Sequence, residues 1–195
     1  RQKPRQSTGL ARAINEGIRN FPAEIQFVSW LGDDDRLTTQ SLSKASRTLE
    51  IESSAVFVFG QCRYIDGAGN PLWLNKSGKW TELLMLCGPQ LIPQPGALMR
   101  RDAYIAIGGL NTSYKWAFDL DLLLKFSQLG KIQYIPKILS SFRWHDGSLS
   151  VGGRKGSVKE ASRIRQNNLP MTIRFCRIVI SEVNVQPTVR TAEPN

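Results

Sequence analysis

Residues 25–35 read IQFVSWLGDDD, and this stretch decides the fold class that we predict. The apolar run from Ile25 to Leu31 has the β-branched and aromatic side chains of a buried, central strand in a parallel sheet. Gly32 ends the run, and three aspartates follow it directly. Ligands of open α/β sheets gather at the carboxyl ends of the strands, so we expect the acids at a ligand-binding edge.

The segments on either side of this stretch alternate between helix and strand patterns. Before it, apolar residues recur at helical spacing from Leu10 to Phe21, and Ser7 or Thr8 can cap that helix. After it, we predict a helix over 38–49 and a strand over 55–65, which turns back at the DGAGN sequence of residues 66–70.

Further along the chain the same alternation continues. The predicted elements are a short helix over 80–86, a strand over 97–99, a helical turn capped by Asp102 and stopped by Gly108 and Gly109, a helix over 119–129, and strands over 131–135 and 138–144. This order of elements predicts an α/β domain with a mixed sheet.

Three consecutive carboxylates, Asp33, Asp34 and Asp35, repel one another unless a cation offsets their charge. Hard divalent ions such as Mg²⁺ and Mn²⁺ take oxygen ligands, usually one or two carboxylates together with substrate phosphates. The cluster therefore fits a site for a metal and a diphosphate. The alternative is a solvated acidic turn, in which Asp35 or Thr38 caps the following helix.

Asp119 and Asp121 open the predicted helix over 119–129. A carboxylate that is held on a rigid element can deprotonate a hydroxyl group as it attacks, so one of the two acids fits a general base. The alternative is that Asp119 is the helix N-cap and that Asp121 is a first-turn acid, which the helix dipole favours. Both roles can hold together.

The single histidine, His145, stands where a predicted strand enters the small-residue loop in FRWHDGSLS, residues 142–150. Its imidazole can ligate a metal or donate a hydrogen bond to a diphosphate oxygen. The alternative is a surface histidine that packs beside Trp144.

Seven pieces of the chain occur in the order found in the inverting family-2 glycosyltransferases, and the sequence therefore resembles that family. These pieces are GLARAINEGI at 9–18, SWLGDDD at 29–35, FG at 59–60 with DGAG at 66–69, QPGALMRR at 94–101, GGL at 108–110, DLDLLLK at 119–125, and RWH at 143–145 with Ser148 and Ser150. No single piece is specific, but the ordered set is.

The resemblance implies a GT-A type α/β fold, with a mixed, mostly parallel sheet flanked by helices. It implies a transferase that moves a sugar from a nucleotide-diphosphate sugar to an acceptor hydroxyl with inversion, in the biosynthesis of cell-surface polysaccharides. In that family Asp34 and Asp35 would bind Mn²⁺ or Mg²⁺, and Asp33 and Asp34 would lie at the ribose-diphosphate of the donor. The family usually has Asp or Asn where this chain has Gly32.

The resemblance also assigns roles to residues outside the aspartate cluster. Asp119 matches the catalytic base, and His145 matches a histidine that reaches the metal or the diphosphate. The segment with Gln94, Arg100 and Arg101 matches the one that lines the acceptor and diphosphate side.

Members of the family begin with a strand-helix-strand unit that holds the nucleotide base, and nothing before Ser7 matches this unit. We therefore expect residues 1–168 to form a partial catalytic domain that lacks it. We expect residues 169–195 to form a C-terminal extension that is partly disordered.

The composition excludes several other classes of protein. The cysteines, Cys62, Cys87 and Cys176, are odd in number and far apart, which argues against a disulfide framework and against a CxxC metal site. No apolar run approaches the roughly 20 residues of a membrane-spanning helix, and no signal-peptide pattern opens the chain. We expect a cytoplasmic protein, which can be peripheral at the inner face of the membrane.

The chain carries a formal net charge of +10, which favours an anionic partner. Residues 151–177 contain seven basic residues and one acid, and this run fits either a solvated helix or a contact with anionic membrane near a saccharide or lipid-linked acceptor. The three aspartates repel nucleic-acid phosphates and aromatic residues do not interleave with the basic run, so we expect no nucleic acid partner. A basic nucleic-acid-binding protein and a non-catalytic remnant of the fold remain the alternatives.

Overall fold

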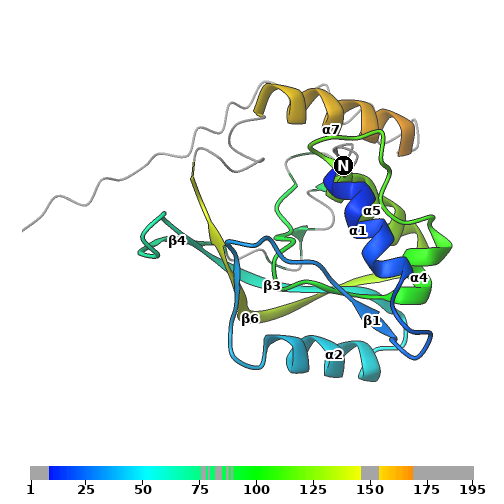
Figure 1. The fold of residues 1–195 in the computed structure, drawn as a ribbon, viewed down its shortest axis with the longest axis horizontal. Coiled ribbons are helices and arrows are strands. Elements are labelled where there is room, and N and C mark those ends of the chain that lie inside the picture. The colour runs from blue at the N-terminus through cyan, green and yellow to red at the C-terminus, as the bar shows by residue number, and fades with distance from the viewer. Residues whose placement is uncertain are drawn as a thin grey trace, which may run out of the picture.

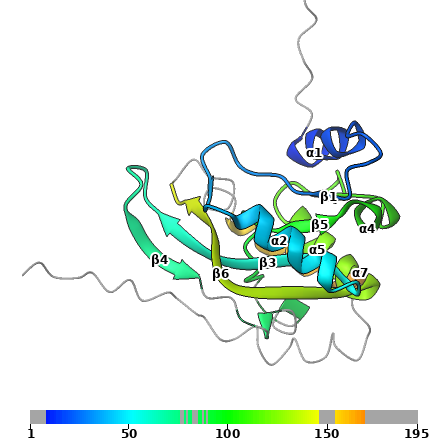
Figure 2. The ribbon, with the colours of Figure 1, turned by 90° about the horizontal axis from the view of Figure 1, so that it is seen from below.

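The computed structural model describes residues 9–75, 78, 80, 81, 85, 86, 88, 90–145 and 154–168. Within them, a six-stranded mixed sheet lies between helices on its two faces (Figure 1). Helix α2 covers one face, and α5 with α7 covers the other (Figure 2). The predicted α/β class with a mixed sheet is confirmed.

The central strand is β3 (Ala55–Ile65), which has the boundaries predicted from its sequence. It pairs in parallel with β6 (Lys131–Arg143), and antiparallel with β5 (Leu98–Arg100) and with β4 (Pro71–Asn75), to which the predicted 66–70 turn connects it. The remaining strands, β1 (Phe27–Val28) and β2 (Arg36–Leu37), pair antiparallel with β5 and β6 respectively.

The expectation of a mostly parallel sheet is wrong, because β3 with β6 is the one parallel pairing among the described strands. The expectation of a central strand over 25–31 is also wrong. Only Phe27 and Val28 pair, at the end of the strand order β1-β5-β3-β6-β2. Their partner β5 is short because Pro93 and Pro95 precede it and cannot donate backbone hydrogen bonds.

Strand β6 is continuous where two strands were predicted. Its register against β3 shifts between the pairs Gly60 with Ile135 and Gln61 with Ile138, so Pro136 and Lys137 form a bulge. Gly60 is required there, because a Cβ at this position would lie 2.7 Å from the Lys137 carbonyl oxygen and 2.5 Å from Leu139 Cγ. A proline that looks like a break in the sequence is thus accommodated inside one strand.

The helices lie close to their predicted positions. They are α1 (Leu10–Arg19), α2 (Ser41–Ile51), α4 (Arg101–Ala106), α5 (Phe118–Leu129) and α7 (Arg154–Asn168). The N-cap of α4 is Arg100 and not Asp102, which lies in the first turn. Residues 82–84 of the predicted helix over 80–86 and all of the expected extension over 169–195 lie outside the described residues.

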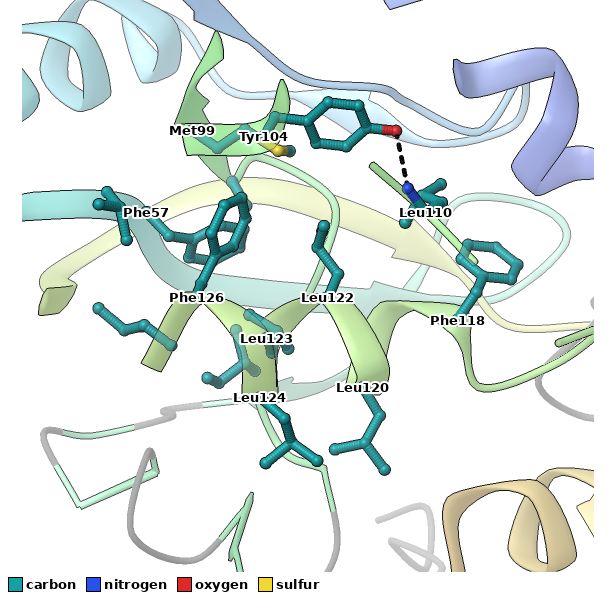
Figure 3. Packing of buried hydrophobic residues seen from close by; sticks show 14 of the residues in the cluster. Phe57, Met99, Tyr104, Leu110, Phe118, Leu120, Leu122, Leu123, Leu124 and Phe126 are labelled. Carbon is teal, nitrogen blue, oxygen red and sulfur yellow. Dashed lines mark hydrogen bonds between the residues drawn. The ribbon is translucent and has the colours of Figure 1, made fainter. Parts of the chain in front are cut away.

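Helix α5 is the centre of the main core. Phe126 on its sheet-facing side packs on Phe57 of β3, with ring centroids 5.8 Å apart (Figure 3). Leu120 and Leu124 point away from the sheet, and both are buried because α7 packs on this other side of α5. A helix that is apolar on all sides is stable only when it is enclosed, so α5 needs both neighbours.

Candidate functional site

The pairing of β2 with β6 brings the aspartate cluster to the end of β6. Arg36 pairs with Ser141, so Asp35 lies beside Arg143 and accepts a hydrogen bond from its backbone N–H at 3.1 Å. Asp34 Oδ2 lies 2.8 Å from Nε2 of His145. Asp34 and His145, which are far apart in sequence and were both assigned to the metal, are therefore in direct contact.

Gly32 leaves room for these two carboxylates. A Cβ at this position would lie 2.8 Å from Asp35 Oδ2 and 3.2 Å from Asp34 Oδ1. Both acids therefore fold back over the glycine, whereas Asp33 is exposed. The absence of a side chain at residue 32 lets Asp34 and Asp35 share one small volume.

The electrostatics of the cluster fit a cation. The pKa of Asp35 is raised above its ordinary value, chiefly because the side chain is partly buried. The negative charges of Asp34 and Asp33 add to this increase, and the hydrogen bond from the Arg143 N–H partly offsets it. A bound cation would relieve this repulsion. Among the residues that the structure describes, no three His, Cys, Asp or Glu side chains form a metal site by themselves. Mg²⁺ usually takes its remaining ligands from water and substrate phosphates, so the two carboxylates fit such a shared site.

Arg143 was not assigned a role, although it lies in the RWH piece. Its guanidinium donates to the carbonyl oxygens of Asp34 at 3.3 Å, Asp66 at 3.0 Å and Gly67 at 2.6 Å. Arg143 therefore holds the aspartate loop against the turn between β3 and β4. The sequence signal for this role was its position two residues before His145.

Asp119 is half-buried in the first turn of α5. Its Oδ2 accepts a hydrogen bond from Gln90 at 3.3 Å, and its Oδ1 accepts one from the backbone N–H of Leu120 at 2.8 Å. Burial raises the pKa of Asp119 to about 6. Ala117 is the N-cap, so the alternative in which Asp119 caps the helix is wrong.

Asp121 has a structural role. It is buried, forms an ion pair with Lys125 at 2.8 Å, and accepts a hydrogen bond from Asn168 of α7 at 3.3 Å. The two acids of the DLD piece therefore differ, because Asp121 pairs with Lys125 whereas Asp119 contacts Gln90 of loop 90–97.

Loop 90–97 connects Asp119 with the aspartate cluster. At one end, Gln90 Nε2 donates to Asp119 and to the Ile92 carbonyl. At the other end, Gln94 Nε2 donates to the Trp30 carbonyl at 2.6 Å, two residues before Gly32. The Gln94 amide thus positions the segment that carries the aspartates. Gln94, one of the predicted site residues, therefore belongs to the loop that links Asp119 to the aspartate cluster.

Arg100 and Arg101 lie elsewhere. Arg100 donates to the carbonyl oxygens of Ala55 at 2.7 Å and of Leu49, at the beginning of β3 and the end of α2. Asp35 contacts Arg143, which pairs with Ile65 at the opposite end of β3.

Arg101 donates to the carbonyl oxygens of Phe21 at 2.9 Å and Pro22 at 3.1 Å, in the connection between α1 and β1. Both guanidinium groups, on Arg100 and Arg101, satisfy backbone carbonyls at chain turns. Their assignment to donor or acceptor binding stays a prediction.

Helix α5 obtains its N-terminal cap from α7. Glu160 accepts hydrogen bonds from the backbone N–H groups of Lys115 at 2.8 Å, Trp116 at 2.8 Å and Ala117 at 3.0 Å. Since α5 has no side-chain cap of its own, this carboxylate satisfies the donors just before the turn that carries Asp119.

Replacing Glu160 with alanine should lower the free energy of unfolding by about 1–2 kcal/mol, the effect of removing a strong helix cap. Urea denaturation measures this change. Glu50→Ala, which removes an exposed glutamate from α2, is the matched control and should be close to neutral. Equal effects of the two substitutions would show that Glu160 contributes no cap.

The basic run of residues 151–177 is only partly a free surface. Arg165 is 8% exposed and donates to the carbonyls of Met85 at 3.1 Å and of Gly88, while Lys159 and Arg163 are exposed. Arg165 therefore anchors α7 to the domain and does not belong to a membrane-facing surface. No helix in the described ranges is long and apolar enough to cross a bilayer.

Comparisons with solved structures find a similar layered fold in a known protein. The chain is similar to TarS of S. aureus, a glycosyltransferase. TarS 1–349 in complex with UDP matches with a TM-score of 0.59 and 15% identity, over 86% of this chain and 47% of that chain. A second structure of TarS 1–349 matches with a TM-score of 0.60 and 14% identity, over 95% of this chain and 58% of that chain.

The chain spans about half the length of these two structures. At such identities the likeness shows the fold alone. Scans against protein-family models and against curated proteins find no match.

Proposed function

We propose that this protein is a metal-dependent glycosyltransferase, which transfers a sugar from a nucleotide-diphosphate sugar to an acceptor hydroxyl with inversion. The observation that carries the proposal is the pair of acidic groups joined by loop 90–97. One is Asp119, with a pKa raised by burial to about 6, and the other is the contact of Asp34 with His145 at 2.8 Å. A base and a diphosphate-binding group close to one loop are what a single displacement requires.

Asp119 accepts the proton of the attacking hydroxyl. A base works best when its pKa lies near the working pH, because it is then ionised and still basic enough to take a proton. The hydrogen bonds from Gln90 and from the Leu120 N–H orient its two oxygens.

Asp34 and Asp35, with His145 in contact with Asp34, would hold Mn²⁺ or Mg²⁺ together with water and phosphate oxygens, and Asp33 lies beside them toward solvent. When bound, the metal supplies charge that stabilises the leaving diphosphate. Arg143 keeps the loop in place by donating to the Asp34 carbonyl. The bound UDP in one TarS structure makes UDP-sugars the first donors to consider.

The test is release of nucleoside diphosphate from UDP-, GDP- and TDP-sugars by the 195-residue chain with Mn²⁺ or Mg²⁺. We expect release with at least one donor, and its loss when the metal is chelated. Absence of release with every donor, together with donor binding by calorimetry, would instead support the non-catalytic remnant. Contact of the exposed Lys159 and Arg163 with anionic membrane stays a prediction.

A further inference from the structure

Four aromatic side chains form a continuous cluster at the far end of the sheet, and we call them the aromatic platform: Tyr64, Trp73, Phe142 and Trp144. Tyr64 pairs across strands with Trp73 of β4 and with Phe142 of β6. The Tyr64 and Trp73 rings stack at 4.6 Å and 15°, and Trp73 meets Trp144 at 5.3 Å and 68°. The two tryptophans thus form a corner of two nearly perpendicular rings.

Both tryptophans are open to solvent, since Trp73 is 46% exposed and Trp144 is 39% exposed. Tyr64 and Phe142 are half-buried and support them from inside, at 5.9 Å and 6.3 Å from Trp144. The hairpin of β3 and β4 projects beyond the helical layers, so β4 carries Trp73 away from the main core (Figure 1). Large aromatic surface that is left exposed on a rigid support is typical of binding sites.

The aromatic platform is linked to the candidate site in two places, through the end of β6 and through loop 90–97. The backbone N–H of Trp144 donates to the Ile65 carbonyl at 2.8 Å, and the next residue, His145, contacts Asp34. Asp35 accepts a hydrogen bond from the backbone N–H of Arg143 at 3.1 Å, and Arg143 lies between the platform residues Phe142 and Trp144 in the chain. Asn75 of β4 donates to the Leu91 carbonyl at 3.1 Å, which ties the hairpin to loop 90–97.

We propose that the aromatic platform is a saccharide-binding subsite, on which a sugar ring of the acceptor stacks against Trp73 and Trp144. This placement rests on the proposed transferase function. The face of an aromatic ring is electronegative and attracts the polarised C–H groups of a sugar ring. The hydroxyl groups at the rim of the same sugar can meet the carbonyl oxygens of Asp66 and Gly67, in the turn between β3 and β4.

An acceptor fits the platform better than the donor sugar. Trp73 is 46% exposed on β4, so a sugar ring of an extended saccharide can lie against it. The donor is held by its diphosphate at Asp34 and Asp35 and does not need a second anchor. Binding of the acceptor saccharide should therefore be independent of the aspartates.

The experiment measures binding of the protein to immobilised linear oligosaccharides of glucose, galactose, N-acetylglucosamine and rhamnose. We expect the unaltered protein to bind at least one series, and the double variant Trp73→Ala, Trp144→Ala to bind it at least about tenfold more weakly. Trp80→Ala is the matched control, because Trp80 is 65% exposed and is not one of the four rings. Trp144→Phe keeps a ring and should retain most of the binding.

Two further measurements separate this proposal from the proposed function. Asp34→Ala should retain saccharide binding, and the double tryptophan variant should retain thermal stabilisation by Mn²⁺ with UDP. Loss of saccharide binding in Asp34→Ala would instead assign the platform to the donor. The single variant Trp73→Ala replaces the double variant if the latter does not fold, as judged by circular dichroism.

Three results would overturn the proposal: no saccharide binding by the unaltered protein, equal binding by the tryptophan variants, or a dimer that dissociates in those variants while saccharide binding is unchanged. The last result, measured by light scattering, would identify the platform as an interface between two copies of this chain.

Discussion

Asp119→Asn should lower the rate of sugar transfer by about 10²–10⁴-fold and leave the dissociation constant of the donor nearly unchanged. The amide keeps the size of the side chain and loses the proton acceptor, and this loss corresponds to about 3–5 kcal/mol of barrier. Steady-state kinetics and calorimetry measure the two quantities. Asp102→Asn, which alters an exposed first-turn acid of α4, is the control and should retain full activity.

The same assignment sets the dependence on pH. Because burial raises the pKa of Asp119 to about 6, kcat/KM should fall as the pH drops below this value and the base becomes protonated. Because the pKa of Asp119 is higher in the folded state than in the unfolded state, ionisation of Asp119 destabilises the fold. This loss of stability begins as the pH rises above the ordinary value of 3.8 and is complete above pH 6. The asparagine variant should therefore be more stable than the parent at pH 7.5, with no such gain at acid pH.

Retained transfer activity in Asp119→Asn would show that this carboxylate is not the base. A loss of activity that comes with a loss of stability at pH 7.5 would assign Asp119 to the structure of α5. The combination of lower activity and higher stability is specific to a buried functional acid.

Asp34→Ala should abolish the rise in melting temperature that Mn²⁺ together with UDP produces in the parent protein. A ligand at a hundredfold excess over its Kd stabilises the folded state by about 2.7 kcal/mol, which corresponds to a shift of roughly 5–10 °C for a domain of this size. Differential scanning fluorimetry measures the shift for each variant against its own ligand-free baseline. That baseline corrects for the broken contact with His145.

Glu24→Ala, which removes an exposed carboxylate between α1 and β1, is the control and should keep the full shift. An equal shift in Asp34→Ala and in the parent would place the diphosphate elsewhere. A shift with UDP that does not depend on Mn²⁺ would separate nucleotide binding from the metal.

Local signals in the sequence located several elements well. The apolar, β-branched run of Ala55 to Ile65 predicted β3 with its observed boundaries, and the glycines after it predicted the turn into β4. The leucine-rich stripe before Gly130 predicted α5 to within one residue. These elements depend on hydrophobic periodicity and turn chemistry, which adjacent residues determine.

Charge was a poor guide to the site. Arg100, Arg101 and Arg165 were read as residues that face a ligand or a membrane, and each donates to backbone carbonyls inside the domain. Glu160 was read as the lone acid of a basic run, and it caps α5. A guanidinium or carboxylate satisfies whichever backbone groups the fold leaves without partners, and those groups are unknown until the elements are packed.

By itself, the sequence determined the α/β class, the positions of most helices and strands, and the acids Asp34, Asp35 and Asp119 as the candidate chemistry. Only the tertiary structure decided the strand order, the antiparallel place of β1, the contact of Asp34 with His145 and the exposure of the aromatic platform. The physical reason is the range of the interactions. Helices, strands and turns follow from contacts within a few residues, whereas pairing, burial and pKa follow from contacts between segments that lie about a hundred residues apart.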